Sequence, residues 1–190
     1  MQDNFSPQQS LALIQSMISR AKNDLSDNRF YFLLWGWVVF IAVIAQFLLK
    51  VVFRYEHHSA VWILIIPAII VTIIYSARKN KDNRVKTYVG ESMSYLWTGI
   101  GISFFVLSLI ISNTGGWEYA FPYFIMFYGL GTFVSGRILK FTPLVIGGIF
   151  NWALAIGCVF VPYDYQLLIT AAAILISYII PGHLLSTNKN

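Results

Sequence analysis

Six apolar segments, separated by short polar or charged connections, dominate this 190-residue chain. A helix that crosses a bilayer needs about 20 mainly apolar residues, and each segment is close to that length. Charged residues, Pro, Gly or Asn bound every segment. The pattern therefore predicts an all-α fold, a polytopic transmembrane helical bundle whose six spans cover residues 30–53, 59–77, 92–112, 117–136, 139–161 and 165–182.

The composition supports this interpretation. Hydrophobic residues make up 57% of the chain and charged residues 11%, whereas an ordinary soluble domain has roughly 45–50% apolar and about 25% charged residues. The first 29 residues lack the short apolar core of a cleavable signal peptide, so we expect them to be retained. We expect a cytoplasmic N-terminal segment at 1–29, one membrane domain at 30–182 and a cytoplasmic tail at 183–190.

The basic residues are distributed unevenly between the connections. If the six spans alternate in direction, eleven of the thirteen Lys and Arg residues fall on one side and two, Lys50 and Arg54, on the other. Cytoplasmic loops carry the excess of Lys and Arg, so both termini are predicted to be cytoplasmic. The net charge of +5 is explained by membrane orientation, and we expect the lipid bilayer, not nucleic acid, as the surroundings of the chain.

An amphipathic helix is predicted before the first span. Ser6-Pro7-Gln8-Gln9 has the form of a capping box with proline at the first helical position. Over residues 7–25, apolar positions at alternating spacings of three and four form a narrow stripe, made of Leu11, Ile14, Ile18, Ala21 and Leu25. The stripe needs a cover: the protein's own loops, the membrane interface, a cytoplasmic partner, or a second copy in a homodimer.

The connection between the second and third spans carries the densest charge. Its basic residues are Arg78, Lys79, Lys81, Arg84 and Lys86. Such a run fixes topology and attracts anionic lipid without specificity, and it is also suited to a specific anionic headgroup or phosphorylated ligand. Both interpretations remain open from the sequence.

Polar residues inside the spans are few, and no charged residue or histidine lies near the middle of any span. Proton relays and many ion pathways need such groups, so proton-coupled transport loses support, although Glu91 at the inner end of the third span could face a cavity. We expect interhelical packing roles for the neutral polar residues at mid-span. Candidates for a polar interior are Gln46, Asn151 and Ser103, with Ser177 in the last span.

Small residues four positions apart allow helix backbones to approach closely. Three such pairs occur, Gly99 with Ser103, Gly131 with Ser135 and Gly147 with Asn151. We expect them at helix contacts.

Sites for metals and catalysis are not predicted. Glu56, His57 and His58 lie together in the first outer connection, with Glu118 and Asp164 in the other two, but adjacent histidines do not easily face one ion, so we expect no metal and no cofactor. The chain has no HExxH, G-x-S-x-G or P-loop motif, so no catalytic residue is predicted. The single cysteine, Cys158, is expected to be a small packing residue.

Four stretches carry a resemblance to a known group of proteins. They are residues 16–22 (SMISRAK), 32–37 (FLLWGW), 128–136 (YGLGTFVSG) and 180–185 (IPGHLL). Through them the chain resembles, over its whole length, a family of uncharacterised bacterial inner-membrane proteins with six helices. The resemblance implies the bacterial inner membrane as the location and implies no activity, cofactor or binding residues.

Two functional hypotheses follow. The first is a nonenzymatic inner-membrane protein whose cytoplasmic amphipathic helix and basic connection bind a partner or regulate a process at the membrane. The second is a transporter or channel subunit for a small, uncharged solute, and an intramembrane enzyme ranks below both. A continuous polar cavity that reaches Gln46 or Asn151 would favour transport, and a closed apolar bundle would favour the first hypothesis.

Overall fold

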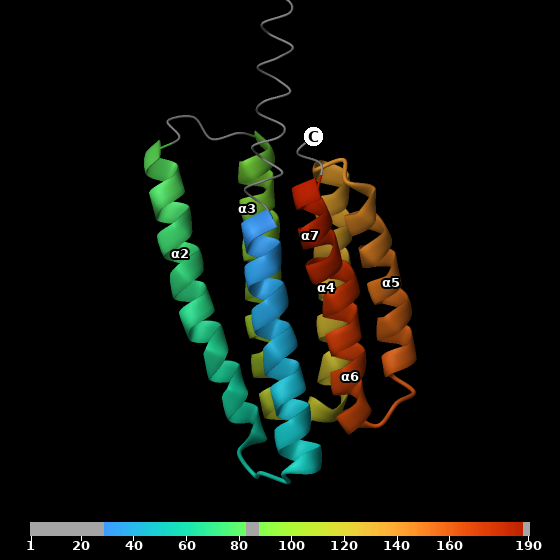
Figure 1. The fold of residues 1–190 in the computed structure, drawn as a ribbon. Helices are drawn as coiled ribbons and strands as arrows, with labels where there is room; N and C mark the ends of the chain where they lie inside the picture. The colour runs from blue at the N-terminus through green and yellow to red at the C-terminus, as the bar shows by residue number, and fades with distance from the viewer. Residues whose placement is uncertain (1–28, 83–87, 188–190) are drawn as a thin grey trace, which may run out of the picture.

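The computed structural model describes residues 29–82 and 88–187, and these residues form helices joined by short turns (Figure 1). No β-strand occurs in either range. The prediction of an all-α bundle is thus confirmed at the level of fold class. The predicted helix at 7–25 lies outside the described residues.

Six long helices match the six apolar segments. The first covers Arg29–Val52 and ends in a π-helical turn, Leu48–Val52. The second begins as a 3₁₀ helix, His58–Leu64, and continues as α2, Ile65–Asp82. The third is α3, Tyr88–Thr114.

The second half of the chain follows the same plan. A 3₁₀ turn, Trp117–Tyr119, leads into α4, Ala120–Ile138, and α5 covers Thr142–Cys158. The last helix consists of α6, Tyr163–Ile174, a π-helical turn, Leu175–Ile179, and α7, Ile180–Thr187.

Four of these helices are long and apolar enough to cross a membrane. They cover Arg29–Val52, His58–Arg78, Tyr88–Thr114 and Tyr163–Leu185, and Thr142–Cys158 is a shorter apolar helix. Length and hydropathy therefore support a membrane-embedded protein.

Successive helices run in opposite directions, so their connections lie alternately at two ends of the bundle (Figure 1). We call one the basic end: the first helix begins there, α2 and α4 end there, α3 and α5 begin there, and α7 ends there. The far end carries the other three connections. The count of Lys and Arg residues on each side of the membrane assumes that the helices alternate in this way.

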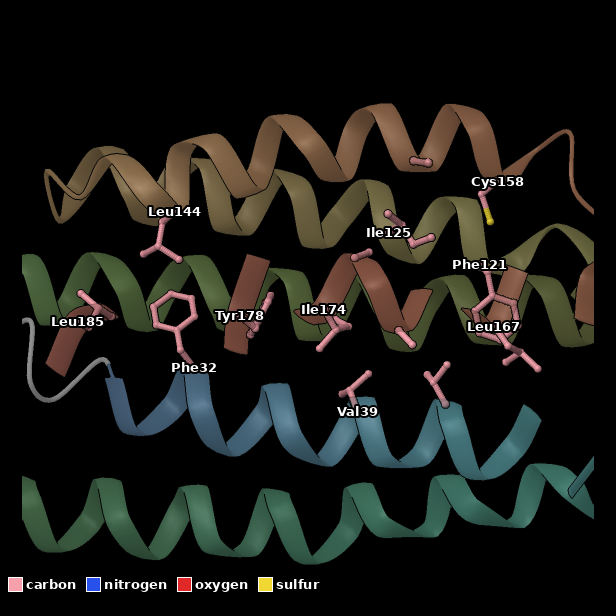
Figure 2. Packing of buried hydrophobic residues seen from close by; sticks show 14 of the residues in the cluster. Phe32, Val39, Phe121, Ile125, Leu144, Cys158, Leu167, Ile174, Tyr178 and Leu185 are labelled. Carbon is pink, nitrogen blue, oxygen red and sulfur yellow. The ribbon is translucent and has the colours of Figure 1, made fainter. Parts of the chain in front are cut away.

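The core lies between the first helix and the second half of the chain. Figure 2 shows Phe32 and Val39 of the first helix close to Ile174 and Tyr178 of the last, and all four side chains are buried. By contrast, α2 lies at the edge: 6% of the apolar stretch in His58–Arg78 is buried inside the protein, against 56% in Tyr163–Leu185. Most of the apolar surface of α2 therefore faces outward.

Glycines set the close contact between α4 and α5. A Cβ atom on Gly148 would lie 2.7 Å from both the Cβ atom and the backbone nitrogen of Phe133, and one on Gly136 would lie 2.6 Å from the backbone nitrogen of Val145. These distances leave no room for a side chain. The two helices are thus packed backbone against backbone, as small residues permit in apolar bundles.

The predicted small-residue pairs behave differently from one another. Gly131 packs against Ile100 and Trp97 of α3, and a Cβ atom on Gly147 would lie 3.0 Å from the Cα atom of Ser177. Nothing lies within 4 Å of the corresponding position on Gly99. The exposed surface of α3 carries Gly99, so this glycine brings no other helix of the described chain close.

Several helix ends differ from the prediction: α2 ends at Asp82 and not at 77, and α3 begins at Tyr88 and not at 92. The expected span 139–161 is observed as Thr142–Cys158, and it begins later because α4 ends in a tight turn: the Phe141 N–H donates to the Gly136 carbonyl at 2.9 Å, and Lys140 takes a positive φ of 52°. The last helix is longer than expected and continues through Pro181. A proline nitrogen cannot donate to the carbonyl four residues earlier, and the π-helical turn directly before it changes the hydrogen-bond register at this point.

Candidate functional site

Gln46 is the centre of the most extensive polar network in the described part of the chain. Its side chain is 2% exposed. The Trp62 indole N–H donates to the Gln46 carbonyl oxygen at 2.8 Å. The Gln46 amide nitrogen lies 3.3 Å from Nδ1 of His58 and 3.5 Å from the Tyr163 hydroxyl oxygen. One amide therefore joins the first helix to the beginnings of the second and last helices.

An ion pair continues this network toward solvent. The Lys50 ammonium lies 2.6 Å from the Asp164 carboxylate and 3.9 Å from the centre of the Tyr163 ring. The two charged side chains are 30% and 44% exposed, so water screens their attraction and the pair contributes at most about 1 kcal/mol. We call the six residues the far-end network: Gln46, Lys50, His58, Trp62, Tyr163 and Asp164.

Local sequence explains how this network forms. Gln46 and Lys50 are four residues apart in the first helix, so they lie on similar faces. His58 and Trp62 belong to the 3₁₀ helix that begins the second helix. Asp164 lies in the first turn of α6, where the positive end of the helix dipole favours a carboxylate. The turn at residues 53–57 then brings the two helical faces together.

The chemistry of the far-end network is that of a structural connection. His58 is engaged by an amide, and among the described residues no three His, Cys, Asp or Glu side chains are grouped so that they could hold a metal ion. The network can fix the relative positions of three helices at the far end.

Asn151 makes a separate contact, which is fully buried. Its side chain is 0% exposed and donates from Nδ2 to the Ser177 hydroxyl at 3.0 Å. Ser177 in turn donates to the carbonyl of Ala173 at 2.7 Å. Because water-accessible surface is absent on Asn151 and Ser177, no water-sized space borders this contact. It joins α5 to the π-helical turn of the last helix.

The third predicted interior residue, Ser103, meets neither amide. Its hydroxyl donates to the Gly99 carbonyl of its own helix at 2.9 Å. The structure therefore places Gln46, Asn151 and Ser103 in three separate environments, and they do not form one polar site.

At the basic end, Arg78 borders a hollow of about 190 Å³, lined also by Phe30, Val71, Ile74 and Tyr75. The rings of Phe30 and Tyr75 are stacked at 3.9 Å. Lys79 and Lys81 belong to the last turns of α2, but the structure does not describe their side chains. Other predicted contact residues lie wholly outside the described ranges: Leu11, Ile14, Ile18, Arg84 and Lys86.

Sequence reasoning did not identify the partners of Gln46. Neither Trp62 nor Tyr163 is among the predicted site residues. The available signal was position along the chain: polar or aromatic residues, Gln46 and Lys50 before it and His58 and Trp62 after it, flank one short connection. That pattern indicates facing helical surfaces but does not identify the last helix as the third component.

Comparison with protein-family models, with curated proteins and with solved structures gives no match to this chain. The resemblance to uncharacterised inner-membrane proteins therefore stays a prediction.

Proposed function

We propose that this chain is a six-span protein of the bacterial inner membrane, with both termini in the cytoplasm, that binds a partner at its basic end. Alternation of the helices between two ends supports the orientation, because the described chain begins and ends at the same end of the bundle. In an alternating six-span topology, the sequence assigns eleven of the thirteen Lys and Arg residues to that side. Cytoplasmic surfaces of membrane proteins carry this excess.

The observation that argues against transport is the burial of the interior polar side chains. Thr132, Ser135, Asn151 and Ser177 are each 0% exposed. A conduction path needs polar groups that face a water-filled space at successive depths. The buried polar side chains are inaccessible to water, which supports a role in packing between helices. We therefore assign the function to the ends of the bundle.

The basic end offers the surfaces for that function. Arg78 borders a hollow there, and the sequence adds the basic run at 78–86. The stripe of Leu11, Ile14 and Ile18 also needs an apolar cover, because a helix of this length is marginal on its own. We propose that a cytoplasmic protein covers the stripe and that the basic run assists its binding.

Site-specific photocrosslinking tests this proposal. A benzoylphenylalanine placed at Ile14 or Ile18 of the full chain, in bacterial cells, should give an adduct with one discrete second protein. Ser16 is the matched control, since it lies on the opposite face of the same predicted helix, and it should give no such adduct. Crosslinks from Ile14 and Ile18 only to the chain's own loops would contradict the proposal and would identify the stripe as an internal contact.

A further inference from the structure

A second hollow at the basic end, distinct from that beside Arg78, lies where α4 turns into α5. Its volume is about 300 Å³, and it is lined by Gly136, Arg137, Lys140, Phe141, Thr142 and Val145. We infer that this hollow binds the phosphate of an anionic phospholipid headgroup. The inference rests on the proposed function only for the leaflet, since it takes the basic end to be cytoplasmic.

Two positive charges in the lining have no counterion among the residues that the structure describes. Arg137 and Lys140 are both exposed, and neither has an ion-pair partner among the described residues. A guanidinium offers a planar pair of donors that matches phosphate geometry, and an ammonium adds a mobile point charge. The hydroxyl of Thr142 provides a neutral donor on the same wall. Together these groups suit an anion with several oxygen acceptors.

Lys140 lies in the turn that ends α4. It has φ 52° and occupies the left-handed position, where the Phe141 N–H donates back to the Gly136 carbonyl. Glycine adopts this conformation at lower cost than any residue with a Cβ atom. The turn places Lys140 in the lining of the hollow together with Arg137.

The walls of the hollow favour a lipid over a free anion. Val145 forms part of the lining, and Ile149, one turn further along α5, is 51% exposed. Residues four apart share a helical face, so an apolar strip leads away from the hollow along the outside of α5. A phospholipid can place its phosphate between Arg137 and Lys140 and its acyl chains along this strip, as basic pockets between transmembrane helices do for anionic lipids.

Binding can be measured on the full chain in phosphatidylcholine nanodiscs that contain a graded fraction of phosphatidylglycerol. Native mass spectrometry would count the retained phosphatidylglycerol, and the melting temperature would report its effect. Lys140→Gly should weaken binding about fivefold, and addition of Arg137→Gln should bring the loss to about 30-fold, at roughly 1 kcal/mol for each charge. Lys140→Gly should keep the turn intact, because glycine suits the left-handed backbone.

Arg54→Gly is the matched control. Arg54 is also basic and also left-handed, with φ 49°, but it lies at the far end and outside this hollow. The Arg54→Gly variant should bind phosphatidylglycerol as well as the parent does. A loss of binding equal to that of Lys140→Gly would overturn the inference in favour of general surface charge. Soluble glycerol 3-phosphate and inorganic phosphate form the second arm. If either soluble anion binds as tightly as phosphatidylglycerol, and this binding depends on Lys140, the lipid is not the preferred ligand and the inference is overturned.

These results do not depend on orientation, since nanodiscs expose both ends of the protein. A failed lipid test would therefore leave the cytoplasmic partner proposal standing, and a failed crosslinking test would leave the lipid site standing.

Discussion

The side-chain amides of Gln46 and Asn151 are both buried in apolar helices, yet they meet different surroundings. Gln46 accepts from Trp62 and contacts His58 and Tyr163. Asn151 makes one side-chain hydrogen bond, to Ser177, whose hydroxyl already donates to a backbone carbonyl. Loss of the Gln46 amide leaves the Trp62 indole N–H without its acceptor. Loss of the Asn151 amide leaves Ser177 still donating to the Ala173 carbonyl.

This difference predicts unequal effects of the same chemical change. Asn151→Leu should lower stability by at most about 1 kcal/mol, the usual value of one interhelical hydrogen bond. Gln46→Leu should cost about 1–3 kcal/mol, because the Trp62 indole N–H loses its acceptor. Thermal unfolding of both variants in one detergent measures the comparison. A greater loss for Asn151→Leu than for Gln46→Leu would contradict the assignment of the far-end network as the stronger connection.

The sequence predicted that Gln46 and Asn151 would reach the interior, and they are 2% and 0% exposed. It did not predict that Ser103 would turn away from both. In a segment that is apolar on every side, the pattern of hydrophobic residues does not identify the inward face. The partners Trp62, Tyr163 and Ser177 depend on how distant helices meet, which spacing within one helix does not determine.

Among the helices, α4 and α5 form the closest pair, and glycine positions decide how close they come. Gly148 faces the backbone of α4, whereas Gly99 faces open space. Both are glycines in apolar helices, and the small residue four positions after Gly99 made it, and not Gly148, the predicted contact. Only the direction in which each residue points, set by the tertiary packing, separates the two.

Substitution by alanine tests this distinction. Gly148→Ala should destabilise the protein by about 1–3 kcal/mol, because the new Cβ atom meets the Phe133 backbone and the two helices must separate. Gly99→Ala should stay within about 0.5 kcal/mol of the parent or stabilise it slightly, since alanine is the better helix former. Unfolding in detergent gives both values. Equal losses in the two variants would show that the α4–α5 contact is not the tight one.

Helix boundaries were predicted to within two residues at Val52 and Tyr163, but α2 and α3 extend into the charged connection beyond their predicted ends, to Asp82 and from Tyr88. A second kind of difference occurs where backbone geometry ends a helix inside an apolar run. Lys140 illustrates the second case, since nothing in its apolar neighbours signals a left-handed residue. The continuation through Pro181 depends on the π-helical turn before it, which has no recognised signal in the sequence.

On the scale of the whole molecule, the two ends of the bundle differ in charge and in the features they carry. The far end has Lys50 and Arg54 and a network that fixes helices together. The basic end has Arg78, Arg137 and Lys140 and the two hollows that they line. This division supports a protein anchored through its interior that interacts through its basic end.

Accessibility of single cysteines in intact cells tests the proposed orientation most directly. Cys158 is first replaced by serine, and one cysteine is introduced at Asn83, in the connection between α2 and α3, or at Asn113, in the exposed last turn of α3 at the far end. A membrane-impermeant thiol reagent should label the cysteine at 113 in intact cells and the one at 83 only after the membrane is opened. Labelling at 83 with protection at 113 would contradict the account.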